Sequence, residues 1–551
     1  MTMKRFWLGA TLAATLLAAP ALAKDELVIG VSQFTTGLHP NLNSHVTTSY
    51  VLGMVRRPFT TSSADWETIC LLCTELPDEA NGTARLWETE DGTPGRAVDY
   101  TIRPDAVWGD GTPVTTRDVL FVYDMGRDET VGFGNLEMYR NIEKIEVQDD
   151  KRFTLYLNRR DCEYQGINDF GLVPAHLEAA LADDRAEYRY RTLYETDPTN
   201  PGLYFGPYRV TRVEPGATIV LEPNETWWGE PPAFKRIVVR TIENTAALEA
   251  NLLSGEIDMI AGEAGITLDQ GLAFEKRHGD DYQVIFQPGL IYEHIDVMLD
   301  NPVLADVRVR RALMYATDRE AISERLFEGR QPVAHGGVNP LDSVYYADVP
   351  KYEFDPQRAI ALLEEAGWTE VVDGVRQNAA GERLSFVIMS TAGNRIRELV
   401  QQVLQSQWRA VGNELTIRNE PPRVLFGETI RQRNFDHLAM FAWISSPQNI
   451  PWTTLHSSMI PTADNNWSGQ NYTGYVKPEM DTALTRVREE CGDEVQDELW
   501  AEIQTRYAED LPALPLDFRA NVFVLPKWLE GLRPTGHQYP STLWVENWHA
   551  R

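Results

Sequence analysis

Two closely spaced cysteines are the first residues of this 551-residue chain whose types and spacing could do chemistry. Cys70 and Cys73 form a C-x-x-C motif, the spacing of disulfide oxidoreductases and of one half of a zinc site. The sequence holds no second C-x-x-C, and no strand–helix–strand pattern surrounds this one, so we expect a structural disulfide or plain thiols. Together with Cys162 and Cys491, these cysteines could form two disulfides in three different ways, and the sequence does not choose among them.

The motifs of common enzyme classes are missing from the sequence. It contains no GxSxG nucleophile elbow, Walker phosphate loop, GxGxxG or HExxH. Of ten histidines only His39 and His45 lie close together, and we expect them to be ordinary polar loop residues rather than metal ligands. The 81 acidic residues still leave room for a glycosidase-like carboxylate pair. We expect no catalytic residue, no metal and no cofactor, and we keep a secreted hydrolase as an alternative.

One stretch combines large aromatic residues with many small polar ones. Residues 441–475 contain Trp443, Trp452 and Trp467 among Ser, Asn, Pro and Gly, a mixture that a core strand would not carry. Flat ring faces with amide and hydroxyl groups suit a cleft for a polar organic ligand. The other interpretation, a long loop whose tryptophans anchor it to the core, stays equally open at this point.

The N-terminal segment has the pattern of a secretory signal peptide. Lys4 and Arg5 precede an apolar run that ends in Ala21-Leu22-Ala23. No cysteine follows the cleavage site, so we expect export to the periplasm without a lipid anchor. The formal charge of −30 argues against nucleic acid as a partner, because a negatively charged protein and a negatively charged nucleic acid repel each other. The same charge suits a soluble monomer.

The elements that must position these residues alternate between helix and strand along the whole chain. Residues 206–224 read as two strands around a Pro-Gly turn, and 243–260 as a helix ended by Gly255 and followed by a strand. Residues 307–327 have the pattern of a helix or helix pair, and 394–412 that of another helix. The fold class is therefore α/β with mixed sheets flanked by helices.

Six sequence blocks, in the same order as in a known family, carry a resemblance. The first, VWGDGTPVTTRDVLFVYD at 107–124, resembles the signature of extracellular solute-binding proteins of the peptide/nickel-binding family, the receptors of ABC importers. Its Gly-Pro turn is expected to precede a helix capped by Thr115 or Thr116, so this block is scaffold rather than site. The other blocks are FGPYRV (205–210), 221–260, 306–333, FDPQRAIALLEEAGW (354–368) and DLPALPLDF (510–518).

The resemblance implies a two-lobed periplasmic binding protein fold of type II, with an extra subdomain and two hinge crossings. The crossings would lie in 287–297 and 511–519. The implied divisions are a signal peptide at 1–23, lobe I at 24–66, 204–288 and 518–551, the extra subdomain at 67–203, and lobe II at 289–517.

The implied function is that of a receptor that closes on a peptide-like or other polar organic solute and delivers it to an ABC permease in the inner membrane. Two alternatives from other classes remain: the secreted hydrolase, and a ligand-sensing subunit that presents its closed form to a receptor. Turnover of a substrate would favour the secreted hydrolase. Only the identity of the partner protein would distinguish the ligand-sensing subunit from the receptor of an importer.

The ligand site departs from the family pattern. Peptide receptors of the family hold the peptide ammonium with the Asp of a W-x-x-Asp stretch, but here Trp443 is followed by Ser446. A serine does not neutralise a buried ammonium, so we expect free α-amino peptides to bind poorly, unless the loop is re-routed to bring in Asp436 or Asp464. A modified peptide, an opine, a glycoside or a metal chelate would fit such a neutral polar cleft. The expected ligand-binding residues are Trp443, Ser445, Ser446, Asn471 and Tyr472 of lobe II, Thr35, Thr36 and His39 of lobe I, and Tyr139 of the subdomain.

Overall fold

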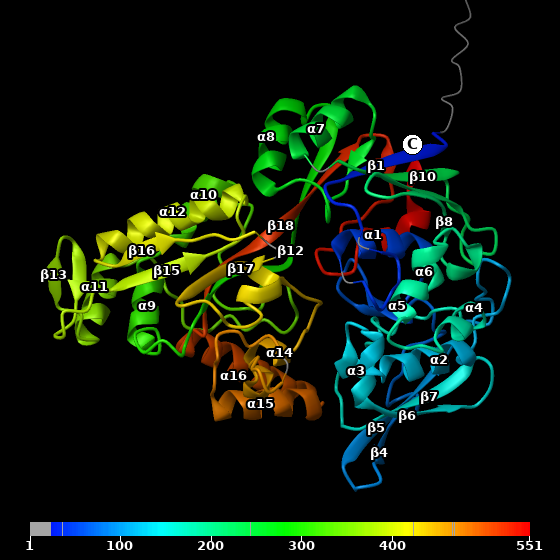
Figure 1. Ribbon diagram of the computed structural model, residues 1–551, viewed down its shortest axis with the longest axis horizontal. Coiled ribbons are helices and arrows are strands. Elements are labelled where there is room, and N and C mark those ends of the chain that lie inside the picture. The colour runs from blue at the N-terminus through cyan, green and yellow to red at the C-terminus, as the bar shows by residue number, and fades with distance from the viewer. Residues whose placement is uncertain are drawn as a thin grey trace, which may run out of the picture.

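Two lobes joined by long strands make up the molecule (Figure 1). The computed structural model describes residues 24–35, 37–43, 45–242, 244–421, 424–465, 467 and 469–551. The expected signal peptide, residues 1–23, lies outside the described residues, as does Thr36. In the described part of the chain, no helix is both long and apolar enough to cross a bilayer.

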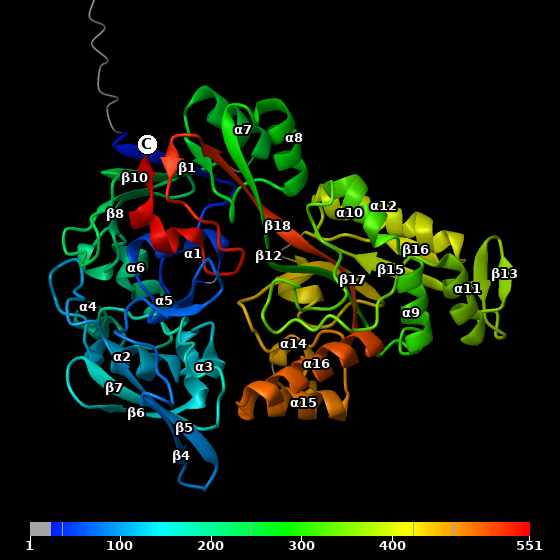
Figure 2. The same cartoon turned by 180° about the vertical axis from the view of Figure 1, so that it is seen from behind.

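A ten-stranded mixed sheet runs through both lobes. β12 and β18 are its longest strands, pair antiparallel with each other, and run from one lobe into the other (Figures 1 and 2). Their register shifts between Pro288 and Ile291, at the point where the chain passes between the lobes. The strands in spatial order are β16 (Glu414–Ile417), β15 (Ser385–Met389), β17 (Leu438–Ile444), β12 (Tyr282–Val297), β18 (Ala513–Pro526), β11 (Met259–Ile260), β1 (Glu26–Val31), β10 (Arg236–Thr241), β9 (Thr218–Pro223) and β8 (Tyr208–Glu214).

Lobe I is the half that holds β1, β8–β11 and the end of the chain. Its helices are α1 (Val46–Val55), α7 (Thr245–Ser254), α8 (Leu268–His278) and the 3-10 segment Ser541–Asn547. α7 ends at Gly255, which has a left-handed backbone with φ 78° and so favours glycine. Two small strand pairs complete it: β2 (Thr60–Ser62) with β3 (Thr68–Cys70), and β19 (Leu529–Glu530) with β20 (His549–Ala550).

A subdomain built on a separate four-stranded sheet extends lobe I. Its antiparallel strands are, in spatial order, β4 (Ala84–Glu88), β5 (Pro94–Thr101), β7 (Arg152–Leu157) and β6 (Ile142–Val147). The helices beside it are α2 (Thr116–Gly126), α3 (Leu136–Asn141), α4 (Ala175–Glu178), α5 (Tyr188–Arg191) and α6 (Leu193–Thr196). Thr115 caps α2 in a capping box with Asp118, as expected of the 107–124 block.

Lobe II is the half that holds β15–β17 and the helices after β12. The segment 307–327, expected to form a helix or a helix pair, forms two helices, and Asp318 caps the second of them. The helices are α9 (Val307–Tyr315), α10 (Arg319–Phe327), α11 (Pro356–Glu365), α12 (Arg395–Ala410), α14 (Trp452–Leu455), α15 (Pro478–Glu489) and α16 (Asp493–Asp510), and a small hairpin joins β13 (Glu370–Val372) to β14 (Val375–Gln377). α15 and α16 lie beside each other on the side of lobe II that faces the subdomain (Figures 1 and 2).

The four cysteines form two disulfides of different kinds. Cys70 and Cys73 are bonded to each other, so of the two expected states, a disulfide or plain thiols, the structure has the disulfide. Cys162, which follows β7 in the subdomain, is bonded to Cys491, which lies between α15 and α16 of lobe II. This second bond therefore joins the two lobes covalently.

Candidate ligand-binding site

The candidate site is built on two strands that lie side by side in lobe II. β12 and β17 are antiparallel, with Tyr292 directly opposite Trp443 and His294 opposite Phe441. Successive side chains of a strand point to opposite faces, so Tyr292, His294 and Asp296 share one face of β12. Trp443 projects from the same face of the sheet, because directly opposed residues lie on one side.

A cavity of about 230 Å³ borders this face of the sheet. Residues of α14 and α16, and the loop that follows β17, supply most of its other walls. Gln538 of lobe I also lines it, and its backbone N–H donates to the carbonyl of Ser445 at 3.3 Å. The cavity therefore lies where lobe II meets the C-terminal segment of lobe I.

Aromatic rings lie nearly parallel along the sheet side of the cavity. The Tyr292 and His294 ring centroids are 4.9 Å apart with an interplanar angle of 10°. His294 and Trp443 follow at 6.4 Å and 16°, and Trp443 and Tyr472 at 5.9 Å and 24°. The Tyr292 hydroxyl is 2.9 Å from the hydroxyl of Tyr507 on α16. These contacts hold the rings in place, so the cavity presents preformed flat surfaces to a ligand.

Asp296 and His294 place ionisable groups on the wall of the cavity. Asp296 is 5% exposed and His294 is 1% exposed, and His294 Nε2 lies 3.2 Å from Asp296 Oδ1. Burial, with the nearby charge of Asp296, raises the pKa of Tyr472 to about 12. Tyr472 is therefore a protonated, uncharged hydroxyl at neutral pH.

The composition of the wall determines what the cavity can bind. Aromatic faces supply contact area, and Ser445, Asn449, Thr454 and Gln470 supply hydroxyl and amide groups that fix orientation. Such a wall suits a small polar organic molecule.

Comparison with known proteins decides the family. The chain matches the bacterial extracellular solute-binding proteins, family 5 (middle), over residues 81–461. The protein is a family 5 solute-binding protein. The sequence-based identification, a receptor of the ABC-importer class with the type II two-lobed fold, is thereby confirmed.

Relatives of this family 5 protein differ in what their names say they bind. It is 25% identical over 446 residues to the oligopeptide-binding protein AppA of Bacillus subtilis, covering 80% of this chain and 78% of that one. It is 23% identical over 520 residues to the nickel-binding periplasmic protein of Escherichia coli, covering 93% and 92%. Among solved structures, the oligopeptide-binding protein of Thermus thermophilus, complexed with a pentapeptide, superposes with a TM-score of 0.78 at 29% identity over 96% of each chain.

The residues expected from lobe II fall into two groups. Trp443 and Ser445 line the cavity, and Tyr472 stacks on Trp443. Ser446 is not among the residues that line it. Asn471 is 0% exposed, and its amide contacts the backbone of Leu455, His456 and Tyr475, so it holds its own loop together.

Of the residues expected from lobe I and the subdomain, the three that the structure describes, Thr35, His39 and Tyr139, are not among those that line the cavity. His39 is fully buried, lies 3.2 Å from the Tyr188 hydroxyl, and has its pKa lowered to about 3 by burial and by the charge of Arg56. Tyr139 is 1% exposed among aromatic neighbours. The Thr35 hydroxyl donates to the Gly37 carbonyl at 2.7 Å. Burial keeps His39 and Tyr139 inside the core, and the His45 side chain caps α1 by accepting from the Thr47 N–H.

Sequence reasoning missed Tyr292, His294 and Asp296. The signal was present, because the three residues follow a period of two within the hinge strand IYEHIDV (291–297). The sequence-based expectation of a neutral cleft did not include this pair: β12 supplies Asp296 to the cavity wall, with the His294 ring 3.2 Å from it.

Proposed function

We propose that this family 5 protein is the periplasmic receptor of an ABC importer, which holds a polar organic solute between its lobes and passes it unaltered to a membrane permease. The signal-peptide pattern at 1–23 supports export to the periplasm. The divisions expected from the sequence, lobe I at 24–66, 204–288 and 518–551, the subdomain at 67–203 and lobe II at 289–517, are part of this proposal.

The position of the cavity carries the proposal. It lies against β12, which passes between the lobes, and lobe I closes part of it through Gln538. A rotation about the β12–β18 connection would change the distance between Gln538 and Ser445, and with it the size of the opening. Binding of a solute and closure of the lobes are coupled by this arrangement.

Mass spectrometry tests the proposal on the purified protein. The protein is incubated with a mixture of small polar metabolites, washed, and denatured to release what it holds. We expect a stoichiometric solute whose mass is the same before and after incubation. A released compound that is a cleavage product of the compound supplied would favour the hydrolase alternative instead.

Uptake into membrane vesicles that carry the permease separates the transport receptor from the ligand-sensing alternative. We expect solute uptake to depend on added receptor and on ATP. Binding to a membrane receptor without any uptake would contradict the transport role while leaving solute binding intact.

A further inference from the structure

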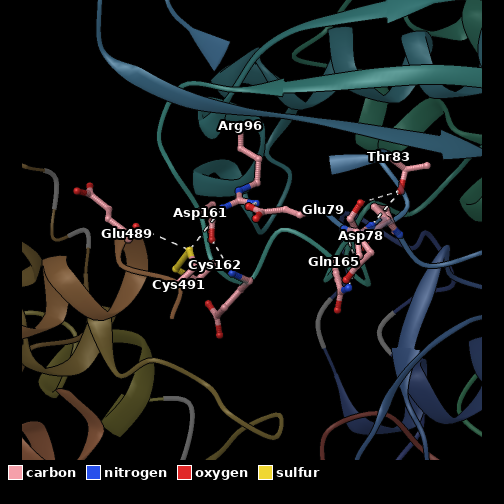
Figure 3. A network of polar contacts seen from close by, with 12 residues as sticks. Asp78, Glu79, Thr83, Arg96, Asp161, Cys162, Gln165, Glu489 and Cys491 are labelled. Carbon is pink, nitrogen blue, oxygen red and sulfur yellow. Dashed lines mark hydrogen bonds and ion pairs between the residues drawn. A yellow bond between two sulfur atoms is a disulfide. The ribbon is translucent and has the colours of Figure 1, made fainter. Parts of the chain in front are cut away.

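A disulfide joins the two lobes at a point away from the hinge. Figure 3 shows the Cys162–Cys491 bond between the subdomain and the loop that joins α15 to α16. In Figures 1 and 2, α15 and α16 lie next to the subdomain, at a distance from the place where β12 and β18 pass between the lobes. The lobes are therefore tied at two separate places, and a body held at two points turns only about the line that joins them.

The bond leaves little room for the lobes to part at this point. The Cα atoms of Cys162 and Cys491 are 5.2 Å apart, and a disulfide tolerates a Cα–Cα distance of up to about 6.8 Å. The subdomain and the α15–α16 loop can therefore separate by less than about 2 Å while the bond is intact. Hinge opening that admits a solute is a rearrangement of more than about 2 Å, so the intact bond opposes it.

The non-covalent contacts beside the bond are weaker. The Cys162 N–H donates to the Arg488 carbonyl at 2.9 Å, and Arg488 Nη2 lies 3.8 Å from Glu137 Oε1 of α3. The Glu137 side chain is 53% exposed, so water competes with this ion pair. Such contacts form and break reversibly, whereas the disulfide holds until a reductant reaches it. The bond therefore determines whether the lobes can open here.

The lobes must part for the cavity to open, because both of them line it. Gln538 of lobe I borders the cavity, and its N–H donates to the Ser445 carbonyl of lobe II at 3.3 Å. On the lobe II side, α14 contributes Leu455 to the wall. Trp452 of the same helix packs against Arg488, whose guanidinium lies 4.2 Å from the ring centroid. The covalent tie between the lobes therefore acts close to the cavity wall.

The surroundings of the bond favour thiol–disulfide exchange. Both cysteines are partly exposed, so a thiolate can reach Cys162. Arg96 Nη2 lies 3.5 Å from Cys491 Sγ, and a guanidinium stabilises a thiolate, so Cys491 is the better leaving group. Arg96 is fully buried, and Glu79 Oε1 accepts from its Nη1 at 2.5 Å (Figure 3). The Tyr164 ring lies 4.2 Å from the same guanidinium, so Arg96 is held in place.

The second disulfide provides a comparison within the same chain. Cys70 and Cys73 lie three positions apart, so their bond does not join the lobes. Cys73 is 2% exposed, which shields this bond from an attacking thiolate. The variant Cys70→Ser/Cys73→Ser isolates the bond between the lobes, because the chain has four cysteines.

We propose that the Cys162–Cys491 disulfide is a redox-sensitive restraint: intact, it keeps the lobes together over the cavity, and its reduction by a dithiol lets them open. A thiolate of the dithiol attacks Cys162 Sγ, the bond between the cysteines breaks, and Cys491 leaves as a thiolate beside Arg96. The second thiol of the dithiol then attacks the dithiol sulfur of the mixed disulfide, and Cys162 leaves. Overall, two electrons and two protons pass to this chain, and the dithiol becomes a disulfide.

Small-angle X-ray scattering of solute-free protein tests the restraint. The protein measured is Cys70→Ser/Cys73→Ser, before and after dithiothreitol, and Cys162→Ser/Cys491→Ser is its matched control. We expect dithiothreitol to raise the radius of gyration of the first protein, and the control to have the larger radius with or without dithiothreitol. Circular dichroism is recorded in parallel, because unfolding also raises the radius. Loss of the folded signal on reduction would overturn the proposal, because the bond would then hold the fold rather than the lobes.

Hydrogen–deuterium exchange of the same variant locates the change. The Gln538 N–H donates across the lobes to Ser445, whereas the Trp108 N–H donates to the Thr112 carbonyl at 2.7 Å within the subdomain. We expect dithiothreitol to speed exchange at Gln538 at least tenfold and to leave exchange at Trp108 unchanged. Unchanged exchange at Gln538, or an equal rise at both sites, would overturn the proposal.

The rate of reduction tests the part that Arg96 plays. Arg96→Gln removes the charge next to Cys491, and Arg85→Gln, at the exposed pair with Asp99, is its control. We expect dithiothreitol to reduce the bond at least fivefold more slowly in Arg96→Gln and at the wild-type rate in Arg85→Gln. Equal rates in the three proteins would overturn the role of Arg96.

Two further results would overturn the whole proposal. One is an equal radius of gyration in oxidised and reduced protein, and the other is peptide mapping that finds no Cys162–Cys491 bond in the oxidised protein. Both measurements are made without a solute or a permease, so either result would leave the proposed transport function standing.

Discussion

Glu293 on β12 and Asp517 on β18 are direct partners across the two strands that connect the lobes. Both carboxylates are buried, but Arg397 binds Glu293 through Nε and Nη2, at 2.6 and 3.0 Å. Burial, and then the charge of Glu293, raises the pKa of Asp517 to about 8. The hinge therefore holds one charged and one protonated carboxyl group at neutral pH.

Asp517 makes the stability of the protein depend on pH. Its pKa is higher in the folded than in the unfolded chain, so its contribution is fully present below about pH 4 and is lost as the pH rises through about 8. We expect Asp517→Asn to flatten the fall in stability between pH 5 and 8 and to be the more stable protein at pH 8. Urea unfolding at several pH values measures this. Parallel pH profiles of the two proteins would contradict it.

Arg397 is expected to be essential for stability, because its removal takes both hydrogen bonds from buried Glu293 and leaves the longer contact to Arg519 Nη1 at 3.8 Å. Breaking a buried pair on one side costs about 3–5 kcal/mol. Arg397→Met should therefore unfold at much lower urea concentration, and Glu293→Gln/Arg397→Met should recover most of the loss. The exposed pair of Arg308 with Asp306 provides a control, since Arg308→Met should change the free energy of unfolding by less than about 1 kcal/mol.

Trp443 is expected to contribute directly to solute binding. Its indole forms part of the cavity wall between His294 and Tyr472, so truncation removes contact area and a neighbour of both rings. We expect Trp443→Ala to weaken binding of the solute recovered from wild type at least tenfold by titration calorimetry. Trp227→Ala, in lobe I beside Arg57, should leave the affinity unchanged. Wild-type affinity in Trp443→Ala would refute this role.

Asn471 is expected to act on stability instead of binding. Its Nδ2 donates to the Tyr475 carbonyl at 2.9 Å and its Oδ1 accepts from the Tyr475 N–H at 2.9 Å, with no exposed surface. Asn471→Ala leaves buried polar groups unpaired, which costs about 1–3 kcal/mol each. Asn449→Ala, at the cavity wall, is the matched control and should keep wild-type stability. An Asn471→Ala protein with wild-type stability and weakened solute binding would show instead that Asn471 is a ligand-binding residue.

Local signals in the sequence were enough to predict several of the helices, but not α8, α15 or α16. The helix at 394–412 forms as α12, capped by Asn394, and Gly255 ends α7. These signals depend on a few neighbouring residues, so a single sequence carries them. The two hinge crossings were located from the family resemblance: β12 contains the first, 287–297, and β18 covers residues 513–519 of the second.

The candidate site was predictable only in part, because its members meet through long-range pairing. Trp443 was recognisable by its motif, whereas Asp296 becomes a site residue only once β12 lies beside β17. The bond between Cys162 and Cys491 spans 329 residues and depends on how the lobes meet, which no local spacing encodes. His39 lies in a loop, as expected, but the rings of Phe133, Tyr188 and Tyr194 from the subdomain pack around it and bury it.

A crystal structure of the protein with its retained solute tests the central claim most directly. The account predicts electron density for the solute in the cavity between Trp443 and Asp296, with Gln538 of lobe I closing over it. Solute density elsewhere between the lobes, with this cavity empty, would contradict the account.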